Sequence, residues 1–471
     1  MRTIMLVFTA LLTACAVGPD FEKPEAPHHG NFRMADAEGA SIANLEWWEL
    51  LQDEELQKLI AIALEENKDL KVATATIQEY EARLMINRMD FAPKLDGTAY
   101  GPAFARQSIF LFPGFPNPFN YYIQGNLNWE LDIWGRIRRE NEAGRADLLS
   151  KEEARRAVIL RLVSDVAQAY FELRQFDMQL DIAKRTIEAW QESVRIGNAR
   201  LRQGYINKLD VDQFEAELAN AKARAAELER QMVQKENQLS VLLGRNPSQI
   251  RRGKPLTEQT MPVAVPAGLP SELLQRRPDI VQVEQELGAA TARIGMAKAD
   301  RFPKLSITGI LGVADPSLKQ LFSRGGDFRA IGPSLTGPLF NASILGYQQD
   351  AAEAQTKQAL AQYEQTVLVA FKEVEDALIA VKTAKDQREA QVEQVKALRS
   401  ALHLANIRYK GGLAQYLDVL IAQRNLFEAE LSLSGTHRLH LVSIVQLYKA
   451  LGGGWPPVGQ EPKPMPVKVA S

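Results

Sequence analysis

The sequence predicts a mainly α-helical, internally duplicated chain with a smaller β part that crosses a membrane. Three observations carry this prediction: apolar residues at intervals of seven, a short segment that occurs twice, and stretches that alternate apolar and polar residues. The repeated segment reads RLRQGYINKLDVD at 200–212 and RYKGGLAQYLDVL at 408–420. Self-similarity at a fixed offset is typical of a chain built from a repeated structural unit. We therefore expect two copies of one long helical hairpin.

The first copy shows the expected helices most clearly. Helical periodicity runs over 54–92 and stops at Pro93, and a much longer helix is expected over 137–203 with a return helix over 209–243. About 65 residues at 1.5 Å each extend for about 100 Å. Packing two half-length helices end to end beside each long one gives four full helix lengths per chain. The heptad positions, typical of coiled-coil packing, are Ile159, Val166, Leu173, Leu180, Ile187, Val194 and Leu201.

The strands are expected in two pairs, near 95–104 with 121–132 and near 304–313 with 328–339. Residues 121–132 alternate between an apolar and a polar face, as in a transmembrane barrel, although a half-buried strand of a soluble sheet has the same pattern. Four strands are too few to close a barrel, and an open sheet in lipid leaves unpaired backbone groups at its edges. We therefore expect oligomerisation, with eight strands from two chains or twelve from three.

The N-terminus, MRTIMLVFTALLTACAVGPDF, predicts an exported protein. Arg2 precedes an apolar run that is too short to span a bilayer, as in a signal peptide. Cys15 follows Leu-Thr-Ala, which resembles the lipobox of bacterial lipoproteins and implies cleavage before Cys15 and a covalent lipid on it. A secretory signal with a chance cysteine is the alternative. Ala16, in place of an aspartate, favours sorting to the outer membrane.

The composition excludes other classes of protein. The chain has 471 residues with 56 basic and 58 acidic side chains, and its net charge of -2 lacks the basic surplus of a nucleic-acid-binding protein. Cys15 is the single cysteine, so neither an intramolecular disulfide nor a cysteine-rich metal site is expected.

The repeats and their flanking segments divide the chain into six parts. Two of them are the copies of the repeat, and the others precede, join or follow these copies. The segments are 1–14 (signal peptide), 15–45 (lipid-anchored arm), 46–244 (first repeat, with β-hairpin 95–132), 245–269 (linker), 270–452 (second repeat, with β-hairpin 304–339) and 453–471 (Pro-rich flexible tail).

Several longer motifs resemble a known family. They read WWELLQDEELQKLIAIALEENKDLKVA at 47–73, NWELDIWGRIRRENEAGRA at 128–146, LLQRRPD at 273–279 and RYKGGLAQYLDVLIAQRNLF at 408–427. In combination they resemble the outer-membrane efflux channels of the TolC type, in the lipoprotein branch that serves resistance–nodulation–division pumps.

This resemblance implies a homotrimer that forms a 12-stranded outer-membrane β-barrel continuous with a 12-helix periplasmic α-barrel. It implies a passive export duct for drugs or other toxic small molecules, with a periplasmic adaptor and an inner-membrane pump as partners. Metal efflux and type I secretion are the alternative exporter classes.

The resemblance also implies a gate at the repeated turns. Asp418 aligns with a pore-facing acidic ring, and Asp210 and Tyr409 align with residues that link neighbouring coils and hold the tip shut. Ala414 and Ile421 depart from the family pattern, since they replace a latching arginine and a second acidic residue. An aspartate that begins a helix also caps free N–H groups, so a structural role for both aspartates stays open.

Three glycines are expected to end the long helices at these turns, where a left-handed backbone is needed. They are Gly204, Gly411 and Gly412.

Catalytic chemistry has little support in the sequence. His437 and His440 lie one helical turn apart but lack a third nearby ligand, and no phosphate-binding loop or Ser/His/Asp set is present. We therefore expect neither an enzyme nor a metal site, and no cofactor besides the lipid on Cys15. A periplasmic adaptor would carry one hairpin in a lipoyl-like domain rather than two in tandem, and a hydrolase would need the missing catalytic set.

Overall fold

The computed structural model describes residues 16–25, 32, 42–46, 50–101, 121–259, 270–315, 317–323, 326–340 and 342–453. Cys15, the signal peptide and the end of the tail lie outside the described residues. The chain divides into two compact units, one of residues 1–25, 75–153 and 282–365, the other of residues 26–74, 154–281 and 366–471. Each unit therefore combines segments from both copies of the repeat.

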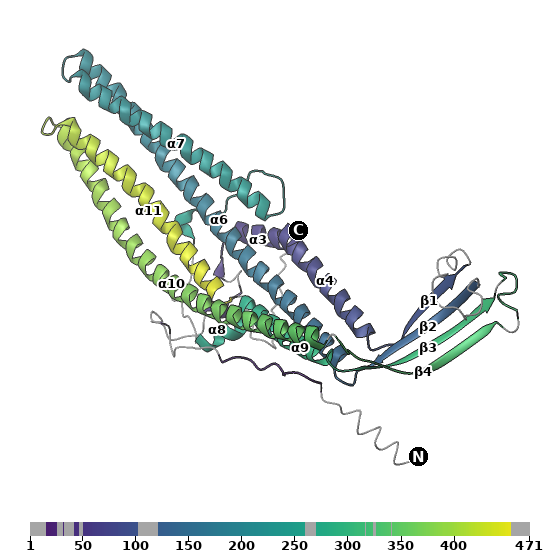
Figure 1. The fold of residues 1–471 in the computed structure, drawn as a ribbon. Coiled ribbons are helices and arrows are strands. Elements are labelled where there is room, and N and C mark those ends of the chain that lie inside the picture. Colours follow the sequence, from purple (N-terminus) through teal and green to yellow (C-terminus); the bar gives the residue numbers. More distant parts are fainter. Residues whose placement is uncertain are drawn as a thin grey trace. The chain divides into compact units, whose positions relative to one another are not determined.

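Two long helical hairpins confirm the internal duplication. The first consists of α6 (Arg136–Arg202) and α7 (Lys208–Leu242), and the second of α10 (Ala342–Lys410) and α11 (Tyr416–Ala450). The long helices have 67 and 69 residues and the return helices have 35 each. In each hairpin the shorter helix runs back along the end of the longer one (Figure 1).

The predicted heptad positions of α6 contribute to this packing to different extents. Val166 and Leu173 are fully buried, as the interval of seven predicts. The other five positions are half-buried within one chain, and these are Ile159, Leu180, Ile187, Val194 and Leu201. Further along α6, Ile182 and Ala183 form a buried cluster with Leu228 of α7 and with two residues of α11, Phe427 and Leu431. Apolar burial of this kind, rather than helix propensity, stabilises helices of such length.

The single helix expected over 54–92 is wrong, because the chain forms two helices there. They are α3 (Glu54–Glu66) and α4 (Lys68–Met89), and the break falls at Asn67, whose ψ is 132°. The buried Asn67 side chain accepts from Leu70 N at 3.0 Å and donates to the carbonyl oxygen of Leu242 at 2.8 Å. A tertiary hydrogen bond to the end of α7 thus fixes a break that the local periodicity does not reveal.

The second copy has its break at the equivalent place. Its helices are α8 (Pro270–Arg276) and α9 (Pro278–Ala299), and Pro278 suits the first position of a helix, where the missing N–H has no intrahelical acceptor. Arg277, at the break, donates to Ala450 O at the end of α11 at 3.1 Å and pairs with Glu373 at 2.7 Å. Both breaks are therefore held against the end of a return helix.

A buried carboxylate fixes the linker that joins the two repeats. Asp53 is 1% exposed and accepts hydrogen bonds from the Tyr170 hydroxyl at 2.9 Å, Lys254 N at 2.9 Å and Gln259 Nε2 at 2.8 Å. It also caps the first turn of α3. Gly253 permits the close approach, since a Cβ there would lie 2.1 Å from the Asp53 carboxylate. The linker is thus tied to α6 and α3 by hydrogen bonds, and its Ile250 and Leu256 side chains are buried as well.

The four strands form one antiparallel sheet in the order β1-β2-β3-β4 (Figure 1). Their bounds are β1 (Lys94–Tyr100), β2 (Tyr121–Leu131), β3 (Lys304–Asp315) and β4 (Asp327–Thr336). The first and last strands are edges within one chain, and Leu95 and Leu335 on them are 77% and 71% exposed. The described residues of one chain therefore leave two edges and much apolar surface uncovered.

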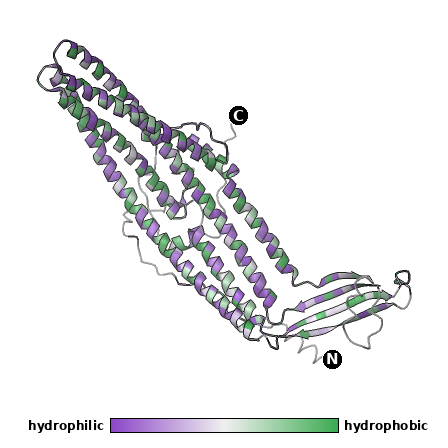
Figure 2. Ribbon diagram, turned by 45° about the horizontal axis from the view of Figure 1, so that its top comes forward, coloured by the Kyte–Doolittle hydropathy of each residue, from purple (hydrophilic) through white to green (hydrophobic). Residues whose placement is uncertain are grey.

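The register places the apolar residues of neighbouring strands on one face. Leu127 lies opposite Gly309 and Trp129 opposite Ile307. On the other face, Asn126 donates to the Thr98 hydroxyl at 3.2 Å. The alternation of apolar and polar residues runs along the strands (Figure 2). Such a sheet suits lipid on one side and water on the other.

None of the helices in the described part of the chain combines the length and the apolar composition that a membrane-spanning helix requires.

Candidate functional site: the tips of the two hairpins

Both hairpin turns close with the same backbone motif. At the end of α6, Gly204 has φ 74°, Gly204 N donates to Leu201 O at 3.0 Å, and Tyr205 N donates to Arg200 O at 3.0 Å. At the end of α10, Gly412 has φ 73° and the corresponding bonds are 3.1 and 2.8 Å long. This is the Schellman arrangement, which satisfies the last carbonyls of a helix. The repeated segment is therefore a repeated helix end.

Gly411 does not share this conformation. Its φ is not positive, so the expectation that it supplies a left-handed residue is wrong. Gly412 alone has that role in the second turn.

The two adjacent glycines provide a matched test. A Cβ at Gly412 would meet no atom within 4 Å, so Gly412→Ala changes only the backbone energy. A left-handed alanine costs about 1–2 kcal/mol, and we expect amide hydrogen exchange in the turn to accelerate about 5- to 30-fold. Gly411→Ala is the control and should leave these rates nearly unchanged. Equal effects of the two substitutions would contradict the assignment.

The first return helix begins with a capping box. Asp210 N donates to the Asn207 side-chain oxygen at 3.0 Å, and Asn207 N donates to the Asp210 carboxylate at 3.2 Å. Asn207 is the N-cap, and Asp210 occupies the third helical position. The carboxylate of Asp210 therefore satisfies backbone groups of its own helix.

The second return helix lacks this device. Its N-cap residue, Gln415, makes no side-chain capping bond, and Asp418 is exposed in the first turn. No partner of the Asp418 carboxylate is found among the described residues. Ala414 is half-buried beside this start, and Ile421 is 40% exposed one turn further along. Of the two aspartates, Asp418 is the one left available to a ligand or to another chain.

Tyr409 connects the two hairpins of one chain. Its hydroxyl accepts a hydrogen bond from the Arg200 guanidinium, whose central carbon lies 4.6 Å from the ring centroid. The ring also packs edge-on against Tyr416 at 4.9 Å, and Tyr416 in turn packs against Phe214 at 4.1 Å. Residues of α6, α7, α10 and α11 thus meet in one cluster near the tips.

The interior of this cluster is closely packed. Phe214 is 1% exposed and lies in a buried cluster with Trp190, Ala221 and Leu420. A Cβ at Gly197 would come within 2.6 Å of the Phe214 ring, so glycine is required there for α6 and α7 to approach. Burial raises the pKa of the Tyr416 hydroxyl, which therefore stays protonated at neutral pH.

Tyr409 and Asp210, which the resemblance placed together in one link between coils, have different contacts in the structure. Tyr409 contacts Arg200 and Tyr416, whereas the Asp210 carboxylate contacts Asn207. Arg200, Tyr416 and Phe214 were not among the residues that the sequence pointed to. A difference between the two copies could have indicated Tyr416. The second copy has tyrosines at 409 and 416, where the first copy has leucine and lysine at the aligned positions 201 and 208.

The two histidines on α11 lie in cationic surroundings. His440 Nδ1 lies 3.3 Å from the Arg388 guanidinium, and desolvation together with Arg388 lowers the pKa of both His437 and His440. In the described part of the chain, no group of three or more His, Cys, Asp or Glu residues could hold a metal ion.

Comparison with known proteins assigns the family. A family profile described as outer membrane efflux protein matches residues 59–245 and 269–453. The probable efflux pump outer membrane protein TtgC of Pseudomonas putida is 36% identical over 464 residues, which cover 96% of this chain and 95% of that protein. The cation efflux system protein CusC of Escherichia coli K12 is 33% identical over 447 residues, covering 94% and 97%.

A solved structure has the same fold. The open state of the MtrE outer membrane channel of Neisseria gonorrhoeae superimposes with a TM-score of 0.83 at 31% identity, covering 93% of this chain and 98% of that one. The profile matches most of the chain, and the relatives match it nearly end to end. The chain therefore belongs to the outer membrane efflux protein family.

Proposed function

We propose that three copies of this chain form a passive duct through the outer membrane, carrying toxic small molecules outward from a pump. The observation that carries the proposal is the four-stranded sheet, which has one apolar face and in which no described residue pairs with the outer edge of β1 or β4. Unpaired edges are costly in lipid, and pairing β4 of one chain with β1 of the next removes them. Three chains then supply twelve strands.

The hairpins supply the periplasmic part of the duct. Four helix lengths per chain give twelve in a trimer, arranged as a barrel with the turns at its periplasmic end. The cluster around Tyr409 and the exposed Asp418 then lie at the constriction. An adaptor protein and an inner-membrane pump are the proposed partners, because the relatives are described as the outer membrane proteins of efflux pumps.

The cargo class follows from the relatives. TtgC belongs to an efflux pump and another relative at 36% identity is a toluene efflux protein, whereas CusC belongs to a cation efflux system at 33%. We propose drugs and solvents as the cargo, with metal cations as the second candidate. The second candidate is favoured by the exposed carboxylate of Asp418.

We also propose that Cys15 carries the lipid that anchors the chain. The residues that follow it lie against the base of the sheet: Val17 N donates to Trp134 O at 3.1 Å, and Asp20 pairs with the buried Arg139 at 2.7 Å. A lipid on Cys15 would thus enter the same membrane as the strands.

Expression in cells that lack their own outer-membrane efflux channel tests the function. The protein, produced with its adaptor and pump, is expected to raise the minimal inhibitory concentrations of several organic drugs or solvents at least fourfold. A challenge with toxic metal cations tests the second candidate, cation efflux, separately. A protein that reaches the outer membrane yet changes resistance to none of these compounds would contradict the proposal.

Asp418 provides a test of the constriction. Three Asp418 carboxylates around one pore attract multivalent cations, and each charge pair in water contributes about 1 kcal/mol at 4 Å. Asp418→Asn should therefore raise the half-blocking concentration of a trivalent cobalt ammine at least tenfold in bilayer recordings. Asp210→Asn is the control and should change block little, because its carboxylate contacts Asn207. Equal block in both variants would remove Asp418 from the pore.

A further inference from the structure

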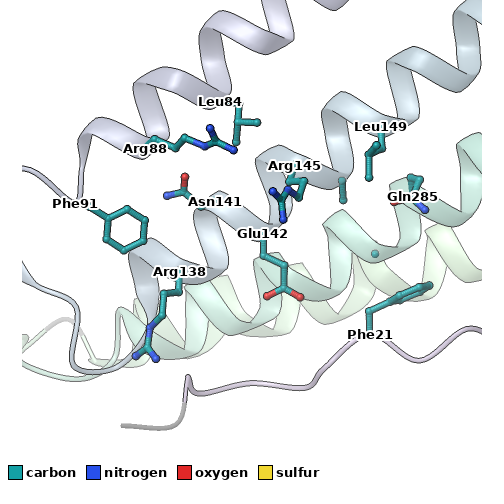
Figure 3. A pocket seen from close by; sticks show the side chains of 12 residues that line it. Phe21, Leu84, Arg88, Phe91, Arg138, Asn141, Glu142, Arg145, Leu149 and Gln285 are labelled. Carbon is teal, nitrogen blue, oxygen red and sulfur yellow. The ribbon is translucent and has the colours of Figure 1, made fainter. Parts of the chain in front are cut away.

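A cavity of about 770 Å³ lies between α4, the first turns of α6, and α9. The N-terminal segment closes one side of it with Phe21 (Figure 3). All of its lining residues belong to one of the two compact units of the chain. The tips, which form the candidate gate, belong to the other unit, so this cavity is a separate feature.

Two of the three arginines that line the described part of the cavity form no ion pair with a described residue. Arg88 of α4 and Arg145 of α6 both line it, and neither forms an ion pair with any described residue. The third lining arginine, Arg138, is held by the Asp132 carboxylate at 3.1 Å. Glu142, the acidic residue among the described lining residues, pairs with Arg139 at 2.8 Å. Two guanidiniums are therefore available to an anion.

A buried polar atom in the same cavity also lacks a partner. The Asn141 side-chain nitrogen donates to Asn87 O at 3.0 Å and to Ile137 O at 2.9 Å, which fixes the orientation of the amide. The side-chain oxygen of Asn141 is then buried without a hydrogen bond to any described residue. A buried acceptor without a donor destabilises the fold. A ligand that brings a donor to this oxygen would remove this unfavourable term.

The remaining wall is apolar. Leu84 is buried, whereas Phe91 and Leu149 remain 44% and 40% exposed. The cavity thus combines two guanidinium groups, one hydrogen-bond acceptor on Asn141 and an apolar surface. That combination suits an amphiphile with an anionic group and a neighbouring hydrogen-bond donor.

The cavity lies beside the base of the sheet. Phe91 precedes β1 by three residues, and Arg145 lies about 10 Å along α6 from Arg138. Two tryptophans mark the same level: Trp129 Nε1 donates to Phe91 O at 2.9 Å, and Trp134 Nε1 donates to Pro303 O at 2.8 Å. Tryptophan is enriched where hydrocarbon meets the headgroup layer. If the sheet spans the membrane, as the proposed function requires, the cavity faces the headgroups.

We propose that this cavity binds the headgroup of a membrane phospholipid. Its phosphate pairs with Arg88 and Arg145, its ammonium or hydroxyl group donates to Asn141, and an acyl chain lies over Phe91 and Leu149. The lipid on Cys15 is a poorer candidate, because a thioether-linked diacylglycerol has no phosphate to pair with the arginines.

Native mass spectrometry of the purified, detergent-solubilised protein tests this inference. The probes are dilauroyl phosphatidylglycerol, dilauroyl phosphatidylethanolamine, dilauroylglycerol without phosphate, and glycerol phosphate without acyl chains. We expect one phospholipid per chain, at least tenfold weaker retention by the Arg88→Gln/Arg145→Gln variant, and no retention of dilauroylglycerol. Arg83→Gln is the control, because Arg83 is an exposed arginine of α4 that pairs with Glu79 outside the cavity lining.

Equal retention of phospholipid by the double variant and the unaltered protein would overturn the proposal. Equally tight binding of glycerol phosphate would overturn it too, since the site would then serve a free phosphate ester. The same spectra report the number of chains in each particle separately from the number of bound lipids. A protein that does not form trimers, which would contradict the proposed function, is thus distinguishable from a protein that does not bind phospholipid.

Discussion

Channels that carry Arg200→Ala are expected to conduct about ten times more at rest than the unaltered protein. Arg200 connects the end of α6 to Tyr409 on α10 through a hydrogen bond and a cation–π contact. A hydrogen bond to a charged group contributes about 1.5–3 kcal/mol and a cation–π contact about 0.5–2 kcal/mol. Losing 1.4 kcal/mol from the closed tip shifts its equilibrium about tenfold. Conductance of purified protein in a planar bilayer measures the change.

Two further variants separate the parts of this contact. Tyr409→Phe removes the hydroxyl but keeps the ring against Tyr416, so its effect should have the same direction and a smaller size. Arg195→Ala is the control, because Arg195 is an exposed arginine of α6 that pairs within its own helix with Glu192 at 2.5 Å. Unchanged resting conductance in Arg200→Ala would mean that this contact does not hold the tip closed.

Replacing Asp53 by alanine is expected to release the linker between the repeats. The substitution leaves the Tyr170 hydroxyl, Lys254 N and the Gln259 amide without their buried acceptor. Such losses cost about 1–3 kcal/mol for each buried donor that is left unsatisfied. Limited proteolysis should therefore cleave the 245–269 segment at least tenfold faster. Asp53→Asn keeps a side-chain acceptor and the helix cap, so it should accelerate cleavage less. If Asp53→Ala is cleaved at the rate of the unaltered protein, Asp53 does not hold the linker.

The pH dependence of this contact has a defined sign. Burial alone raises the pKa of Asp53, but hydrogen bonds from Gln259, Tyr170 and the main chain outweigh it and place the pKa below its ordinary value of 3.8. A lowered pKa in the folded state stabilises the fold above the ordinary value, and the contribution is lost as the pH falls through the folded value. Proteolysis of the linker should thus be constant from about pH 5 to 8. Acceleration within that range would show that another group controls it.

The helical part of the fold was predictable because its determinants are local and repeated. Heptad positions such as Val166 and Leu173 are buried as expected, and the duplicated turn marks both hairpin ends. The break at Asn67 was not predictable from periodicity, because its acceptor, Leu242 O, lies 175 residues away. Sequence spacing records which residues share a helix face but not which distant backbone atom a side chain reaches.

The candidate site was predicted in position but not in its contacts. The sequence placed Tyr409, Asp210 and Asp418 at the turns, and they lie there. The contacts that these residues form depend on how two hairpins, 208 residues apart in sequence, pack together. This packing brings Arg200 of the first hairpin to Tyr409 of the second. The different φ angles of the two adjacent glycines in the second turn were not predictable from the sequence either. The cavity at the base of the sheet could not be predicted, since its arginines come from separate helices.

The proposed function requires that the four-stranded sheet closes only as a trimer, and that this trimer conducts. The most direct measurement is the mass of the purified mature protein in detergent, followed by single-channel recording of that same species in a planar bilayer. Three chains per particle and discrete conductance steps, reduced by a trivalent cation, are the predicted result. A monomer, or a trimer that never conducts even with Arg200→Ala, would contradict the account.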